Sequence, residues 1–153
     1  MSKSINLYNQ LANHKLFNKS VNFGLKRIKL ALSLLGHPEK KLKNTISVIG
    51  ESGKFTTLFS LKSFIEANKQ RVTAHISPSL KDIKERFYMA DKYLTHIEIE
   101  KTIKKIEKLN IPLTVFECLT LVYILNASKV NADYNIQETG ALWRLDSNNI
   151  HDF

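Results

Sequence analysis

The sequence lacks the features that mark secreted and membrane proteins. Its single cysteine, Cys118, excludes an internal disulfide framework and fits a reducing compartment. No apolar run approaches the roughly 20 residues that cross a bilayer. The first 18 residues lack the apolar stretch and small-residue cleavage site of a signal peptide. We therefore expect a cytoplasmic protein with no membrane partner.

Arginine is also scarce, although the formal net charge is +9. The only arginines are Arg27, Arg71, Arg86 and Arg144, so lysine carries nearly all of the positive charge. The lysines are spread thinly, apart from a denser group at residues 40–43. Clustered basic residues interleaved with exposed aromatic residues are typical of nucleic-acid binders. We therefore do not expect nucleic-acid binding, whereas a general attraction to small anions is compatible with the charge.

A length of 153 residues, 43% of them hydrophobic and 24% charged, indicates one soluble globular domain. Residues 1–18 carry little pattern and are predicted to be an N-terminal extension, so the domain covers residues 19–153. Apolar spacing predicts helices at about residues 21–35 and 54–68, from residue 95, and at about residues 114–127. Short β-branched runs predict strands at residues 45–50, 72–77 and 134–139, and residues 78–94 form an irregular connection. Strands that alternate with helices indicate an α/β fold, a parallel sheet with helices on both faces.

The main chemical signal is a glycine-rich turn between a predicted strand and a predicted helix. Gly50 and Gly53 let the backbone amides curl toward phosphate oxygens, and the following helix presents a positive dipole end. Lys54 adds a mobile charge. Candidate ligands for ATP phosphates or their metal ion also include the nearby hydroxyl-bearing residues Ser52, Thr56 and Thr57.

Two features count against this phosphate loop. The first glycine lies three residues before Gly53, whereas the strict P-loop pattern has five. Glu51 also places a carboxylate beside the proposed phosphate site. The alternative interpretation is an ordinary glycine-rich turn with a solvated Lys54. The strand, loop and helix context favours the functional interpretation.

Six segments resemble, in order, the start of the folylpolyglutamate synthase/dihydrofolate synthase family, which is related to the Mur ligases. The family patterns are an opening helix, a leucine-glycine-proline loop, the phosphate loop, a serine-proline loop, a helix start and a glycine-rich strand end. The matching segments are FGLKRI (23–28), LLGHP (34–38), GESGKFTT (50–57), SPSL (77–80) with ER (85–86), LTVFE (113–117) and ETGALWRLDSNN (138–149). The resemblance covers about residues 17–150 and implies a P-loop-type, Mur-ligase-like ATP-binding domain.

The resemblance implies a carboxylate–amine ligase. In this family ATP phosphorylates a carboxylate of dihydropteroate or folate, and the amine of L-glutamate attacks the acyl phosphate to form an amide. The implied cofactors are ATP and Mg²⁺. Ser77 and Glu138 match metal-binding positions, and Phe116, Asp146 and Ser147 match positions that line the pterin pocket.

Each of these residues also has a structural interpretation. Glu117, next to Phe116, is explained by a capping box with Thr114 three residues earlier. Phe116 could equally be a core residue, and Ser77 could simply end its strand. Glu138 ends a predicted buried strand, where an unpaired carboxylate is costly, so we expect it to have a ligand or partner.

Three other residues have no chemical role that the pattern supports. His37 and His75 have no metal-ligand partners at a useful spacing, so we interpret them as structural or surface residues. Cys118 is predicted to be a buried helix residue.

Departures from the family pattern leave a second function open. Glu51 and Phe55 replace small or polar residues, Ser79 replaces a histidine, and residues 142–143 replace a glycine pair. The family also continues well beyond this length with a metal-binding histidine, a modified lysine and a second domain. We therefore expect an incomplete ATP-binding domain without the C-terminal domain. The alternative function is a non-catalytic nucleotide- or folate-binding module, and an unrelated P-loop phosphotransferase is a third. The sequence does not predict the oligomeric state.

Overall fold

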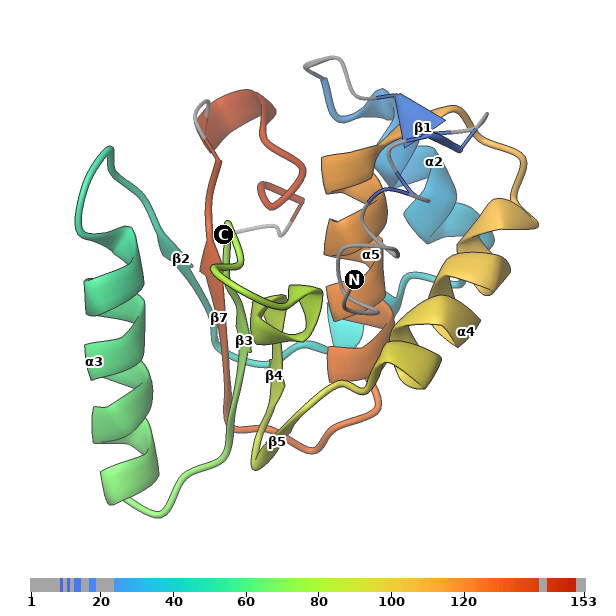
Figure 1. Ribbon diagram of the computed structural model, residues 1–153. Coiled ribbons are helices and arrows are strands. Elements are labelled where there is room, and N and C mark those ends of the chain that lie inside the picture. Colours follow the sequence, from blue (N-terminus) through green and yellow to red (C-terminus); the bar gives the residue numbers. More distant parts are fainter. Residues whose placement is uncertain are drawn as a thin grey trace.

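The computed structural model describes residues 9, 11, 13, 14, 17, 18, 24–140 and 143–150. In this part of the chain a five-stranded sheet has the strand order β2-β7-β3-β4-β5. Strands β2, β7 and β3 run parallel, and β4 and β5 are antiparallel to their neighbours. Helix α3 covers one face of this sheet, and α2, α4 and α5 lie on the other (Figure 1). The predicted α/β class with helices on both faces is confirmed, although the sheet is mixed.

The elements are short and follow one another closely. The strands of the large sheet are β2 (Thr45–Val48), β3 (Val72–His75), β4 (Phe87–Met89), β5 (Lys92–Tyr93) and β7 (Tyr134–Glu138). The α-helices are α2 (Lys26–Leu34), α3 (Lys54–Ala67), α4 (His96–Glu107) and α5 (Val115–Ala127). Three 3-10 helices cover Pro38–Lys41, Ile83–Arg86 and Trp143–Leu145. A separate parallel pair joins β1 (Phe17–Asn18) to β6 (Leu113–Thr114).

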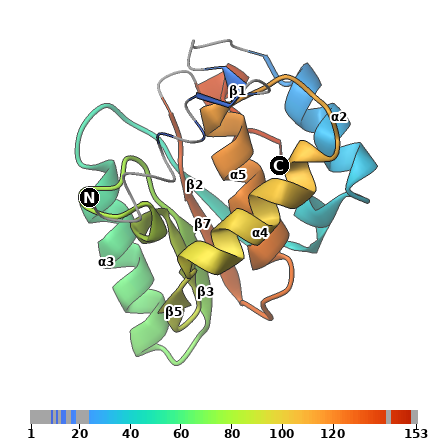
Figure 2. The ribbon, with the colours of Figure 1, turned by 45° about the vertical axis from the view of Figure 1, so that its right-hand side comes forward.

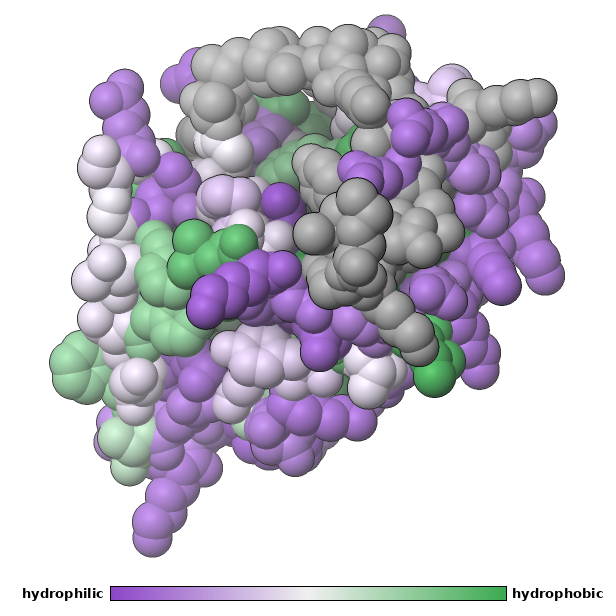
Figure 3. All heavy atoms as spheres, viewed as in Figure 1, coloured by the Kyte–Doolittle hydropathy of each residue, from purple (hydrophilic) through white to green (hydrophobic). Residues whose placement is uncertain are grey.

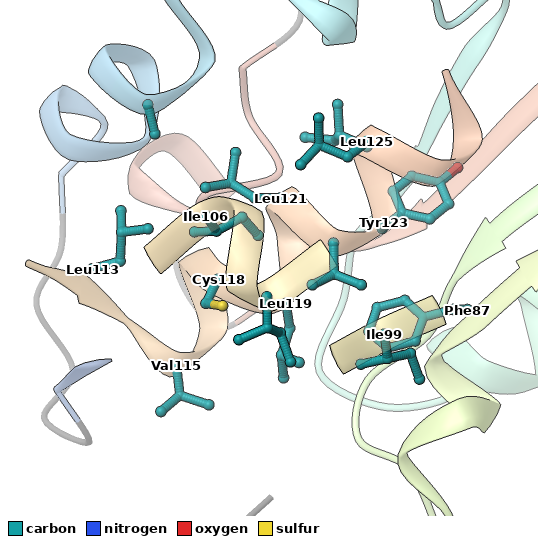
Figure 4. Packing of buried hydrophobic residues seen from close by; sticks show 14 of the residues in the cluster. Phe87, Ile99, Ile106, Leu113, Val115, Cys118, Leu119, Leu121, Tyr123 and Leu125 are labelled. Carbon is teal, nitrogen blue, oxygen red and sulfur yellow. The ribbon is translucent and has the colours of Figure 1, made fainter. Parts of the chain in front are cut away.

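Helix α5 is the centre of the larger core. Its apolar residues lie all around the helix, as in a helix that is buried on every side. Helix α4 lies across it (Figure 2) and buries Ile99, Ile103 and Ile106 in the same cluster. Figure 4 shows Ile99 and Ile106 among side chains of α5, with Phe87 from β4 beside Ile99. A smaller core, which includes Leu58 and Ile136, lies under α3. The two hydrophobic cores lie on opposite faces of the sheet.

Local signals located the starts of α4 and α5 correctly, but not that of α2. Thr95 and Thr114 both form complete capping boxes, with Glu98 and Glu117 respectively. Helix α2 begins at Lys26, later than predicted, because Leu25 is its N-cap and Gly24 has a φ of 130°, which an α-helix does not contain. Residues 21–23 of the predicted helix lie outside the described residues. Most of the predicted N-terminal extension also lies outside them.

The prediction of an irregular connection at residues 78–94 is wrong. This segment holds the 3-10 helix Ile83–Arg86 and the antiparallel strands β4 and β5. Strand β4 has three residues and β5 has two. Such short strands cannot show the alternation of apolar and polar residues by which a strand is predicted from sequence. Strand β4 is stabilised by pairing with the buried strand β3, over residues Thr73 to His75 of β3.

Candidate ATP and metal site

Three predicted site segments meet at one edge of the sheet. The glycine-rich loop follows β2, Glu138 is the last residue of β7, and Ser77 lies just beyond β3. Because these strands are parallel and neighbours, their carboxyl ends lie together, with Val48 of β2 beside Glu138. This edge is where open α/β sheets bind ligands.

Glycine is required at both ends of the loop. Gly50 has φ 149° and Gly53, the N-cap of α3, has φ 78°. Residues that carry a side chain rarely adopt these φ values. Space is not the reason for glycine at position 53, because a Cβ added there would meet no atom within 4 Å. The glycines therefore serve backbone conformation, and they expose residues 50–53 at the amino end of a 14-residue helix.

Lys54 crosses the loop and binds its carbonyl groups. Its Nζ atom donates to the Gly50 oxygen at 2.8 Å and to the Glu51 oxygen at 3.4 Å. These bonds hold an ammonium group above the turn. Ser52, Thr56 and Thr57 are exposed in the loop and first helical turn. The structure thus gathers the predicted ATP-binding residues around one turn.

The buried Glu138 carboxylate accepts a hydrogen bond, as we expected for a buried charged group. It is only 4% exposed, and its Oε2 atom accepts a hydrogen bond from the Ser77 amide at 2.9 Å. Arg86 donates to the Ser77 hydroxyl at 3.3 Å, and the Asn148 side chain donates to the Glu138 carbonyl at 2.8 Å. Ser77 and Glu138 therefore form one bonded unit at the sheet edge.

The oxygen atoms of Ser77 and Glu138 suit a hard cation such as Mg²⁺. No group of three or more histidine, cysteine, aspartate or glutamate residues that could hold a metal occurs in the described chain. A metal ion here would therefore take its other ligands from water and from a bound phosphate, as Mg²⁺ commonly does.

The predicted pterin-pocket residues form a second group beside the metal residues. Asp146 accepts hydrogen bonds from the amides of Gly140 at 3.0 Å and Asn148 at 2.9 Å. Burial raises the pKa of Asp146, and the two amide bonds oppose this shift. A Cβ added at Gly140 would collide with the Asp146 carboxylate and lie 3.7 Å from the Phe116 ring.

Phe116 and Ser147 differ in how accessible their side chains are to a ligand. Phe116 is half-buried, with its ring 6.2 Å from that of His75. The buried Ser147 hydroxyl already shares a 2.9 Å hydrogen bond with Thr120. The structure brings Phe116 and Asp146 together around Gly140, whereas the Ser147 hydroxyl is engaged with α5.

Two buried residues near the site that carry ionisable side chains were not predicted to be functional. The His75 ring is stacked 5.2 Å from Tyr123, and burial, with Arg86 adding to it, lowers the His75 pKa to about 3. His75 is therefore an interior residue and not a surface one, and its lack of a chemical role stays a prediction. Arg86 is only 6% exposed, and its only signal in the sequence was its place in the family pattern.

Glu117 has a structural role, as predicted. Besides capping α5 it forms a two-point ion pair with Arg27, with atoms 3.2 and 3.1 Å apart. This pair joins α2 to α5. Cys118 is buried in α5, as predicted, and burial raises the pKa of its thiol well above the usual range.

No protein-family profile matches the chain. The dihydrofolate synthase/folylpolyglutamate synthase of Buchnera aphidicola subsp. Schizaphis graminum is 33% identical over 139 residues, which cover 89% of this chain and 33% of that protein. The chain resembles folylpolyglutamate synthase/dihydrofolate synthase.

Solved structures of folylpolyglutamate synthase/dihydrofolate synthases share the fold. Escherichia coli FolC in complex with DHPP and ADP is 31% identical with a TM-score of 0.88, covering 99% of this chain and 36% of that chain. A bifunctional enzyme bound to Mn, AMPPNP and L-glutamate is 28% identical with a TM-score of 0.86, with the same shares covered. The chain thus spans about a third of the length of these proteins.

Two departures from the folylpolyglutamate synthase pattern, Glu51 and Phe55, lie in the loop and the first turn of α3. Phe55 is 44% exposed and its ring lies 4.4 Å from that of Phe59, while Glu51 is exposed in the turn itself. Leu142 and the Trp143 side chain lie outside the described residues. The described residues include no helix long and apolar enough to cross a membrane.

Proposed function

We propose that this chain forms the ATP-phosphate and metal-binding part of a cytoplasmic ligase that adds L-glutamate to dihydropteroate or folate. The observation that carries the proposal is the meeting of the glycine-rich loop with the Ser77–Glu138 unit at the carboxyl edge of parallel strands. Nucleotide, metal and glutamate are bound in similar structures, which supports ATP, Mg²⁺ and L-glutamate as ligands. Residues 19–153 then form a partial Mur-ligase-like domain.

The loop residues act on the phosphates of ATP. Phosphate oxygens replace the Gly50 and Glu51 carbonyls as partners of the Lys54 ammonium, and the loop amides and α3 dipole add to this attraction. The γ-phosphoryl group moves from ATP to the substrate carboxylate, which leaves ADP and an acyl phosphate. Ser77 and Glu138 would hold Mg²⁺, which would supply positive charge to this transfer. The amine of glutamate then attacks the acyl phosphate, an amide bond forms, and phosphate leaves.

The pterin substrate is assigned to the group around Gly140. The half-buried Phe116 ring offers a face to a flat heterocycle, and the adjacent Asp146 and Ser147 offer polar atoms. DHPP in the E. coli relative supports a pterin ligand. The same geometry would serve the alternative, a module that binds ATP and folate without turnover.

Metal-dependent nucleotide binding tests this proposal. We would titrate the chain with ATP in the presence and absence of Mg²⁺, using wild type, Glu138→Gln and the exposed control Glu100→Gln. Wild type and the control should bind ATP about tenfold more tightly with Mg²⁺, and Glu138→Gln should lose most of this gain while keeping metal-free binding. An equal gain in all three proteins would contradict the metal site. Glutamate-dependent ADP formation with dihydropteroate would then separate the ligase from the non-catalytic module.

A further inference from the structure

Asn148 connects the proposed metal site to the proposed pterin group. Its side-chain amide donates a hydrogen bond of 2.8 Å to the carbonyl of Glu138, the last residue of β7. Its backbone amide donates one of 2.9 Å to the Asp146 carboxylate, which also accepts from the Gly140 amide at 3.0 Å. Asn148 is fully buried, so these bonds are shielded from water. One residue thus ties the position of Glu138 to that of Asp146.

His75, the last residue of β3, interacts with the Asn148 side chain. Hydrophilic residues cover most of the molecular face in Figure 3, but both of these residues are fully buried. Burial, and then the Arg86 charge, lower the pKa of His75, whereas the interaction with Asn148 raises it. A pKa rises in this way when the ring donates a hydrogen bond, because donation favours the protonated ring. The side-chain oxygen of Asn148 is therefore the atom directed toward His75.

The His75 ring and the Asn148 oxygen complement each other chemically. Their contact is looser than a standard hydrogen bond, but neither ring nitrogen and not the Asn148 Oδ1 atom has any other partner among the described residues. A histidine ring carries at least one N–H group in either protonation state, and an amide oxygen only accepts. Because an unpaired buried donor or acceptor is costly, the ring favours one orientation of the amide. In that orientation the Asn148 NH₂ group points to the Glu138 carbonyl.

Aromatic neighbours hold the His75 ring in place. It is stacked with Tyr123 of α5 at 5.2 Å and with Phe87 of β4 at 5.8 Å, and the Phe116 ring lies 6.2 Å away. His75→Phe would keep a ring among these neighbours but would remove the group that can donate to Asn148. The packing role of His75 is therefore separable from its hydrogen-bonding role.

We infer that His75 and Asn148 are positioning residues of the ligase site: His75 orients the Asn148 amide, and Asn148 fixes Glu138 relative to Asp146. The inference rests on the proposed function, which assigns Mg²⁺ to Glu138 and the pterin to Asp146. Neither positioning residue has to touch a ligand. Phosphoryl transfer requires nucleotide and substrate in fixed relative positions, and this pair holds the two groups that would bind them.

Hydrogen exchange, measured by NMR on the isotopically labelled chain, tests the orientation without any ligand. We expect the Asn148 amides to exchange about tenfold faster in His75→Phe than in wild type. His75→Gln and His75→Asn keep a donor near one or the other ring nitrogen, so at least one of them should restore slow exchange. Tyr123→Phe is the matched control, because it removes a buried hydroxyl group bonded to Thr73 from the same cluster. It should leave Asn148 exchange as in wild type.

A purely structural role of His75 predicts a different result. His75→Phe replaces a buried polar ring by an apolar one, so its free energy of unfolding in urea should equal or exceed that of wild type. A residue that only fills space would then leave Asn148 exchange unchanged or slower. That result, or equal acceleration in Tyr123→Phe, would overturn the inference. Asn148→Leu gives an independent check, because the Gly140 amide, which shares Asp146 with Asn148, should also exchange faster in it.

Titration with dihydropteroate in the presence of Mg-ATP measures the consequence for binding. His75→Phe should bind dihydropteroate about tenfold more weakly than wild type while its metal-free ATP binding is unchanged. Equal dihydropteroate affinity of the two proteins would overturn the positioning role. No dihydropteroate binding by wild type would instead count against the proposed function, and hydrogen exchange would still decide whether His75 orients Asn148.

Discussion

At the scale of single residues, the proposed phosphate loop is held by contacts that a bound ATP would have to replace. Lys54 binds two carbonyl groups of its own loop, and Glu51 brings a carboxylate to the same turn. We expect both features to weaken phosphate binding, the first by competition and the second by repulsion. Their effects are separable, because Glu51 can be neutralised without removing the Lys54 ammonium.

Neutralising Glu51 should strengthen ATP binding. We expect Glu51→Gln to bind Mg-ATP roughly three- to fivefold more tightly than wild type at low salt, with a smaller difference at high salt. Fluorescence titration at two ionic strengths measures this, with Glu100→Gln as the control. Equal binding by Glu51→Gln at low salt would show that the carboxylate does not repel the nucleotide, and weaker binding would show that it assists binding.

Gly140 is constrained by its contact with Asp146. A methyl group there meets the Asp146 carboxylate, so Gly140→Ala should destabilise the protein by about 1–3 kcal/mol in urea unfolding. Asp146→Ala removes the obstructing group, and the double variant should be more stable than the sum of the single effects predicts. Additive effects would mean that the two residues do not meet.

At the scale of secondary-structure elements, strand β3 carries a titratable residue at its buried end. His75 is fully buried with a pKa of about 3, well below its unfolded value, so the folded state holds it neutral. The unfolded state binds its proton as the pH falls below about 6.5. His75 therefore removes stability progressively between about pH 6.5 and pH 3.

Urea unfolding at pH 7 and pH 5 measures this effect. His75 should reduce the free energy of unfolding by roughly 2 kcal/mol between these values, and His75→Gln should lack this part of the loss. If both proteins lose the same stability, His75 is not the group that titrates.

Helices were predictable from sequence where their signals are local. The capping boxes at Thr95 and Thr114 occupy four residues each and located α4 and α5. Strands β4 and β5 were missed because pairing with β3, not their own pattern, stabilises them. The Arg27–Glu117 ion pair joins residues 90 positions apart, a contact that no local pattern indicates.

At the scale of the whole molecule, the candidate site arises from strand order. The resemblance named Ser77 and Glu138, but their hydrogen bond depends on β3 and β7 being neighbours. The order β2-β7-β3 reflects contacts between distant segments, which sequence spacing does not specify. The close approach of Gly140 to Asp146 likewise depends on how the last loop folds back. The roles of these residues in binding remain predictions that ligand measurements test.

The central claim is that residues 50–57 form a working phosphate loop. Calorimetric titration with Mg-ATP tests it most directly, comparing wild type with Lys54→Ala and with Lys69→Ala, an exposed lysine beyond the other end of α3. We predict that wild type and Lys69→Ala bind Mg-ATP and that Lys54→Ala binds at least about tenfold more weakly. Equal binding by all three proteins, or no binding by wild type with a folded circular dichroism spectrum, would contradict the claim.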